Sequence, residues 1–140
     1  MTSTSLHFEL VSPEKLLVSK EAALVTVPGG EGNYGVLPAH APMITTVRPG
    51  VIDVYEQNQN TISERIFVAG GFAEVTQERC TVLAEEAVPV GELDRAQLEQ
   101  QAQNLNEDIG LAKSDAERAG IQAQLVVVKA KLQAVSAANH

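Results

Sequence analysis

The chain has 140 residues, of which 20% are charged and 44% are hydrophobic, a balance typical of folded globular proteins. Its formal net charge of −8 argues against nucleic-acid binding, because contact with phosphates requires concentrated lysine and arginine. The only cysteine, Cys80, has no internal disulfide partner, which favours a reducing compartment. No signal peptide opens the chain and no apolar run approaches the roughly 20 residues that cross a bilayer, so we expect a soluble protein without membrane insertion.

Short apolar runs separated by turn residues fill the first part of the chain. The first run alternates apolar and polar residues from Leu6 to Leu10. Six further runs follow at residues 22–27, 43–47, 51–55, 66–69, 72–76 and 80–84. Strands at about ten-residue spacing, with Gly and Pro turns between them, predict a β-sandwich or a small barrel.

The rhythm changes near residue 90, where apolar residues begin to recur at alternating steps of four and three. They are Leu98, Ala102, Leu105, Ile109 and Ala112, and then Ile121, Leu125, Val128, Leu132 and Val135. Ser114 and Glu117 fit a capping box at the start of a second helix. We expect two helices of about 18–20 residues in an antiparallel hairpin. The predicted fold is therefore α+β, mainly β, with a β-sandwich at 1–88 and a helical hairpin at 89–140.

Val126 and Val127 widen the apolar face of the second predicted helix beyond the seam of the hairpin. Contact with the β module and docking of a partner are both open interpretations of this wider face.

A GxGxxG pattern runs from Gly30 to Gly35, directly after a predicted strand. Dinucleotide binding would require a helix next, whose N-terminus meets the pyrophosphate. Pro38 and Pro42 prevent that helix. We therefore expect the glycines to permit turns with positive φ.

Residues capable of covalent or metal chemistry do not gather in the sequence. His7, His40 and His140 fall in a predicted strand, a loop and the last position, without the short spacing typical of metal ligands. For His40, capping of backbone groups and contact with a partner are both open. Cys80 lies in an apolar run and should pack in the core, and Glu85 and Glu86 should face solvent. We expect no catalytic site, no metal and no cofactor.

The segment EGNYGVLPAHAPM, residues 31–43, closely resembles the epsilon subunit of bacterial F-type ATP synthase. Further matching segments are FELVSP at 8–13, RPG at 48–50, VAGGFAEV at 68–75 and TVLAE at 81–85. A sandwich followed by a helical hairpin is also the architecture of that family.

This resemblance implies a non-catalytic rotor subunit of the central stalk, which couples rotation of a proton-driven ring to ATP synthesis in the catalytic head. Its partners would be the gamma subunit, the membrane rotor ring and, through the hairpin, the alpha/beta head. Its place would be the cytoplasmic face of the bacterial inner membrane, as a peripheral part of the complex. By position, the loop from Glu31 to Pro42, including Asn33 and His40, would face the ring. Some relatives carry a carboxylate at the position of Asn33.

In the family, the hairpin lies folded on the sandwich or extends toward the head, where it can suppress ATP hydrolysis. The resemblance makes Arg118, Lys129 and Lys131 candidates for contact with acidic segments of the head. Ordinary solubilising surface charge is the alternative interpretation of these three residues.

Some family members bind ATP through an Ile/Leu-Asp-x-x-Arg-Ala segment. This chain has Leu93, Asp94, Arg95 and Ala96, so its arginine follows the aspartate by one residue instead of three. On a helix this shift turns the arginine by about 200°. We therefore predict that the protein does not bind ATP.

Two other classes of protein are alternatives. A free-standing regulatory or ligand-binding sandwich could use its hairpin to form a homodimer. An enzyme is the less favoured class, because the sequence provides no nucleophile–base pair and no metal cluster.

Overall fold

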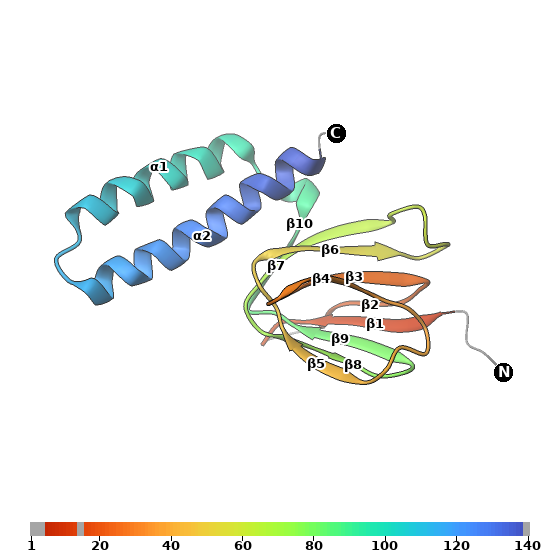
Figure 1. Ribbon diagram of the computed structural model, residues 1–140. Helices are drawn as coiled ribbons and strands as arrows, with labels where there is room; N and C mark the ends of the chain where they lie inside the picture. The colour runs from red at the N-terminus through yellow and green to blue at the C-terminus, as the bar shows by residue number, and fades with distance from the viewer. Residues whose placement is uncertain (1–4, 14–15, 139–140) are drawn as a thin grey trace. The chain divides into compact units, whose positions relative to one another are not determined.

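Two compact units make up the chain, Met1–Pro89 and Val90–His140. The structure is a computed structural model that describes residues 5–13 and 16–138, so His140 lies outside the described residues. Strands form the first unit and helices the second, as the arrows and coiled ribbons of Figure 1 show. The predicted α+β class, mainly β, is confirmed.

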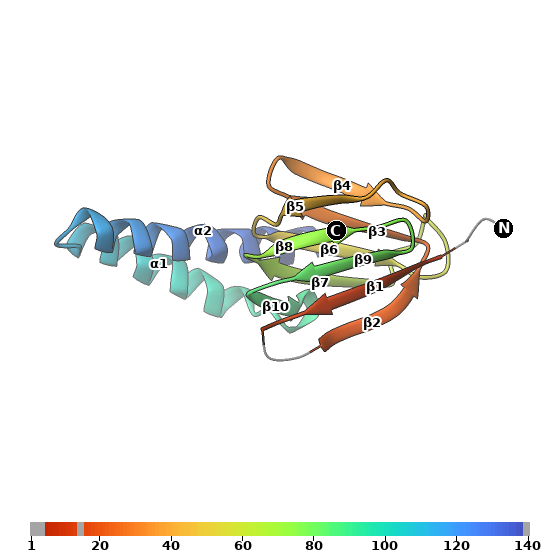
Figure 2. The ribbon, with the colours of Figure 1, turned by 90° about the horizontal axis from the view of Figure 1, so that it is seen from below.

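The first unit is a sandwich of two five-stranded sheets. In the first sheet the order is β2 (Leu16–Ala22), β1 (Leu6–Val11), β9 (Arg79–Leu83), β8 (Phe72–Val75) and β5 (Met43–Thr46). In the second sheet it is β10 (Glu86–Pro89), β7 (Glu64–Ala69), β6 (Gly50–Tyr55), β3 (Leu24–Gly29) and β4 (Gly32–Val36). Strands β1 and β9 pair in parallel, and the other neighbouring strands are antiparallel. Figure 2 looks onto the first sheet.

Three edge strands, β2, β4 and β10, were not among the predicted runs. The run at 22–27 is divided between the end of β2 and β3, and Glu86 is a half-buried residue of β10 where a solvent-facing segment was predicted. Gly32–Val36 is a strand paired with β3, and among the glycines of the GxGxxG pattern only Gly32 has a positive φ, of 146°. Gly32 and Gly35 of the pattern lie in the edge strand β4, where they carry no side chain.

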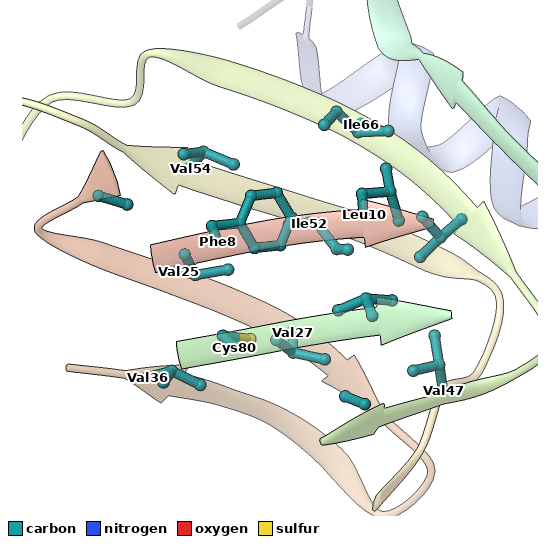
Figure 3. Close-up of a cluster of buried hydrophobic side chains, with 14 of the residues drawn as sticks. Phe8, Leu10, Val25, Val27, Val36, Val47, Ile52, Val54, Ile66 and Cys80 are labelled. Carbon is teal, nitrogen blue, oxygen red and sulfur yellow. The ribbon is translucent and has the colours of Figure 1, made fainter. Parts of the chain in front are cut away.

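The core lies between the sheets and is apolar. Alternation along β1 turns Leu6, Phe8 and Leu10 inward, and each is at most 1% exposed. Figure 3 shows Phe8, Leu10 and Cys80 from the first sheet among side chains of the second sheet. Cys80 is fully buried, as predicted, and burial raises the pKa of its thiol to about 12. Among the described residues no buried side chain is polar or charged.

The second unit begins with a short 3₁₀ turn, η1 (Val90–Glu92), and continues with α1 (Arg95–Leu111) and α2 (Asp115–Ala138). The side chain of Asp94 caps α1 by accepting a hydrogen bond from the backbone N–H of Gln97. Ser114 Oγ accepts from the N–H of Glu117 at 3.0 Å, which confirms the predicted N-cap of α2. The Glu117 carboxylate accepts from Lys113 N, one residue before the position that a standard capping box uses.

The predicted helical hairpin is confirmed, and its seam is thin. Leu98, Leu125, Val128 and Ala134 are buried on the helices, together with Val90 of η1, which contacts α2. The other residues of the heptad stripe are half-buried. Of the two residues that widen the stripe, Val127 is half-buried and Val126 is 57% exposed.

Gly71 occupies the sharpest turn of the sandwich, between β7 and β8. Its φ is 97°, and a Cβ atom there would overlap the carbonyl oxygen of Leu83 on β9. Both the backbone angle and the lack of space therefore require glycine at this position.

We expect Gly71→Ala to lower the free energy of unfolding of the sandwich by more than about 2 kcal/mol, since an L-residue at positive φ and a backbone overlap both cost energy. Urea unfolding followed by tyrosine fluorescence measures this, because both tyrosines, Tyr34 and Tyr55, lie in the sandwich. The matched control is Gly120→Ala on α2, where a Cβ atom has open space; it should stabilise the helix by about 1 kcal/mol. Equal stability of Gly71→Ala and the parent protein would show that this account of the turn is wrong.

Candidate functional site

A row of apolar side chains crosses the outward face of the first sheet. The register places Phe72 opposite Leu83, Leu83 beside Val11, and Val11 opposite Leu16. Their strand neighbours Ala73, Val82 and Leu10 are buried in the core, so the row itself faces outward. Ile44 on the edge strand β5 lies diagonally from Phe72, because Thr46 is opposite Phe72 and Ile44 is opposite Glu74. The exposed fractions are 70% for Ile44, 55% for Leu16, 41% for Phe72 and 37% for Leu83.

We call this set, Leu16, Val11, Leu83, Phe72 and Ile44, the apolar row. Contiguous exposed apolar surface of this kind marks an interaction site in soluble proteins. The sequence analysis missed it, although a signal was present: Phe72 alternates out of phase with the buried Ala73 and Val75. An apolar residue out of phase with the core is turned toward the outside of the sheet.

The other end of the same face carries paired polar groups. His7 Nδ1 donates to Glu21 Oε2 at 2.7 Å, and His7 Nε2 lies 3.0 Å from Ser19 Oγ. Arg79 donates to Glu9. The hydrogen bond from His7 is the largest cause that lowers the pKa of Glu21 below its usual value. These groups pair with one another, whereas the apolar row is exposed in the described part of the chain.

The four residues that the resemblance assigns to ring contact lie in two places. Glu31 and Asn33 are exposed where the β3–β4 hairpin turns, and His40 and Pro42 lie in the loop after β4. Asn33 is the second residue of β4, and residues 34–39 lie between it and His40, of which 34–36 complete the strand. The two pairs therefore lie at opposite sides of β4 along the chain, one at its start and one in the loop that follows it.

His40 and its neighbours form a fixed loop. His40 Nδ1 donates to the carbonyl oxygen of Ala41 at 2.7 Å, which is the backbone-capping contact weighed in the sequence analysis. Ala39 has a φ of 69°, a left-handed conformation, and its N–H donates to Gln77 O at 2.8 Å. Backbone strain of this kind persists only where the surroundings hold it.

Three hydrogen bonds connect the hairpin turn to the segment that begins with β5. Gly30 N donates to Thr46 O at 3.0 Å, Tyr34 Oη bonds to Thr45 Oγ1, and Arg48 donates to Asn33 Oδ1. The first two of these bonds join residues that line a groove of about 500 Å³, formed by residues 29–34 and 43–46. Burial is the main cause that raises the pKa of Tyr34, so its hydroxyl is neutral at physiological pH.

The basic residues of α2 do not converge on one point. Arg118 lies near the start of the helix and pairs with Asp115 at 2.9 Å. Lys129 is eleven residues further, close to three full turns, and therefore lies on the same face as Arg118. Lys131 is turned by about 200° from Lys129.

The segment from Leu93 to Ala96 forms the start of α1. The Asp94 carboxylate is used as the helix cap, and Arg95 is the first helical residue. Leu93 is half-buried and Ala96 is exposed. Within the described ranges, no three His, Cys, Asp or Glu side chains are grouped in a way that could hold a metal ion. No helix of the described residues has both the length and the apolar character needed to span a membrane.

Comparisons with known proteins cover both units. Residues 5–90 match the beta-sandwich domain of the ATP synthase delta/epsilon family, and residues 94–140 match the C-terminal domain of the ATP synthase epsilon family. The protein is 61% identical to the ATP synthase epsilon subunit of Rhodospirillum centenum, over 94% of its own length and 92% of the relative. It is 52% identical to that of Paramagnetospirillum magneticum, over 94% of its own length and 97% of the relative.

Solved structures share the fold at low sequence identity. A subunit in the Euglena gracilis mitochondrial ATP synthase structure, which contains OSCP, F1 and the c-ring in rotational state 1, superposes with a TM-score of 0.83 at 22% identity. That match covers 100% of this protein and 84% of the other. A subunit in the Tetrahymena thermophila central stalk and c-ring structure gives 0.63 at 12% identity, over 96% and 99%. From the matches to both family domains and the close bacterial relatives, we conclude that the protein belongs to the epsilon subunit family of ATP synthases.

Proposed function

We propose that the protein is a non-catalytic rotor subunit of the central stalk of F-type ATP synthase, and that it couples rotation of a proton-driven ring to ATP synthesis. The observation that carries this proposal is the apolar row, an unpartnered docking surface in a member of this family. A peripheral position on the cytoplasmic face of the bacterial inner membrane belongs to the same proposal. In that position the subunit is held by its partners.

The gamma subunit is the partner proposed for the apolar row. Phe72 and Leu83 lie side by side near the centre of the row, and Ile44 extends it to the edge of the sheet. Large apolar side chains at the centre of an interface carry most of its binding energy, while a polar rim excludes water. The paired charges around His7 and Glu21 would form such a rim.

Contact with the membrane rotor ring is proposed for the two pairs described above. Glu31 and Asn33 stand at an exposed turn, where polar loops of another protein could reach them. His40 and Pro42 would form a second contact in a loop already fixed by its own hydrogen bonds. Because residues 34–39 separate the pairs along the chain, their contributions can be tested with separate variants.

The hairpin is the proposed regulatory part, reaching the alpha/beta head and suppressing ATP hydrolysis. The helices bury few apolar side chains, so little free energy favours one arrangement of the hairpin over another. A partner could therefore shift the hairpin between two packings. Arg118 and Lys129 would present one positive face to acidic segments of the head, and Lys131 would meet them only from another side. The absence of ATP binding remains a prediction, supported by the use of Asp94 as a helix cap.

The experiment that tests the proposal is add-back to coupling membranes stripped of their own epsilon subunit. We expect the protein to restore ATP-driven proton pumping per ATP hydrolysed, because the rotor would regain its link to the ring. Proton pumping and ATP hydrolysis are measured together, with the unsupplemented membranes as the control. If neither changes while the catalytic head is competent, the rotor proposal is wrong and the dimeric binding-module alternative is favoured.

Phe72→Asp should weaken binding to gamma by at least about tenfold, since it places a charge at the centre of the apolar row. Titration calorimetry with purified gamma, or with a gamma-containing head complex, measures the affinity. Ile62→Asp is a matched control, because Ile62 is 42% exposed in the β6–β7 loop, away from the row. Equal losses in the two variants would count against the row as the docking surface.

Reversing the charge of both Arg118 and Lys129 to Glu should raise ATP hydrolysis by the reconstituted complex, because the positive face proposed to hold the head would become negative. The Arg118–Asp115 pair is exposed and contributes little to stability, so the hairpin should still fold. Lys131→Glu, about 200° around the helix, is the comparison variant and should raise hydrolysis less than the double variant does. Unchanged hydrolysis in the double variant would contradict a head contact through this face.

A further inference from the structure

The turn of the β3–β4 hairpin needs support from outside itself. We call residues 30–33 the tip. Two of its four residues are glycines, another glycine precedes it, and β4 is an edge strand whose first two residues are exposed. Glycine loses more backbone freedom on ordering than any other residue. A tip of this composition therefore takes one conformation only where other groups hold it.

The groups that hold the tip come from one neighbouring segment, residues 45–48. The hydrogen bond between Tyr34 and Thr45 holds the middle of β4. The bond from Gly30 N to Thr46 O holds the other side of the turn. A Cβ atom on Gly30 would lie closer to Thr46 Oγ1 than a van der Waals contact allows, so the two segments approach closely at this point. Asn33 is paired in register with Pro28 of β3, and a third contact holds its side chain.

Arg48 makes that third contact and is itself well anchored. Its backbone N–H donates to Pro28 O at 2.9 Å, which fixes Arg48 beside β3. Its guanidinium then reaches Asn33 Oδ1. At Gly50, a Cβ atom would lie 3.2 Å from Arg48 Nη1 and 2.8 Å from Pro28 Cβ, so the missing side chain leaves room for the arginine.

We propose that Arg48 is a positioning residue, which holds Asn33 and the tip in the conformation that meets the rotor ring. This inference rests on the proposed ring contact. Arg48 acts through Asn33 and through the charge that it places beside the tip. Among the ion pairs of the described residues none involves Arg48, and the side-chain contact of its guanidinium is the hydrogen bond to Asn33.

The first test is amide hydrogen exchange in the full-length protein. In Arg48→Met, which keeps the apolar stem and removes the donors, we expect tip amides to exchange about tenfold faster, while core amides such as those of β1 and β9 do not change. Arg48→Lys should give an intermediate rate, because it keeps one charged donor without the fork. Unchanged tip exchange in Arg48→Met would overturn the inference.

The matched control is Arg65→Met. Arg65 lies on β7 of the sandwich and pairs with Asp53 at 3.0 Å, far along the sequence from the tip. Arg65 is half-buried, as Arg48 is. The substitution removes this arginine and its ion pair with Asp53 and changes no residue of the tip. Faster tip exchange in Arg65→Met as well would show a general loosening and would also overturn the inference.

Asn33→Asp provides a test in the opposite direction. In the parent protein only the donor of this hydrogen bond is charged, and a carboxylate at position 33 would turn the contact into an ion pair, which adds the attraction of opposite charges. We expect slower tip exchange in Asn33→Asp than in the parent protein, and no such slowing when Arg48→Met is also present. Slowing that persists in the double variant would contradict the contact.

The second test is coupling, in the same add-back to epsilon-stripped membranes. We expect Arg48→Met to lower proton pumping per ATP hydrolysed, Arg48→Lys to restore part of it, and Arg65→Met to leave it unchanged. If Asn33→Ala and Glu31→Ala lower coupling and Arg48→Met does not, the positioning role is wrong while the ring contact stands. If none of the tip variants lowers coupling, the proposed ring contact itself fails, and the role inferred for Arg48 fails with it.

Discussion

The closure of two apolar sheet faces against each other is the constraint on which the other features of the sandwich depend. Each strand commits alternate residues to a core in which no described polar side chain is buried. Burial in this core keeps even the Cys80 thiol protonated at neutral pH. What the sandwich does must therefore be done by residues that face outward or lie in its turns. An apolar side chain such as Phe72, out of phase with Ala73 and Val75, is informative for that reason.

Periodicity in the sequence predicts the inner strands and the helical hairpin, because these are the segments that burial organises. It fails at the edge strands. β4 contains two glycines in five residues, and its pairing with β3 comes from backbone hydrogen bonds that leave no mark on the side-chain pattern. The contacts of the tip were equally hidden, since Arg48 and Asn33 are fifteen residues apart and no local rule pairs them. Resemblance named Glu31 and Asn33 without revealing what holds them.

The hairpin is organised differently from the sandwich. The described helices bury four side chains, and η1 adds Val90, which packs on α2. Each buried leucine or valine contributes about 1.5–3 kcal/mol and Ala134 contributes less, and much of this offsets the entropy of ordering the helices. The caps at Asp94 and Ser114 define where the helices begin and add about 1 kcal/mol each. Because its helices have well-defined starts but bury few side chains between them, the hairpin can keep its helices while a partner changes how they pack.

The charge at the tip follows from the same local geometry. Compared with a carboxylate at the same position, the Asn33 side chain by itself gives the proposed ring contact one negative charge fewer. The structure places the Arg48 guanidinium on that amide, so the charge of the tip is set by Glu31 and Arg48 together and sums to zero. A carboxylate at position 33 would pair with Arg48 and leave the tip with a net charge of −1. Residues 33 and 48 therefore act as one unit, and the surface offered to the ring depends on both.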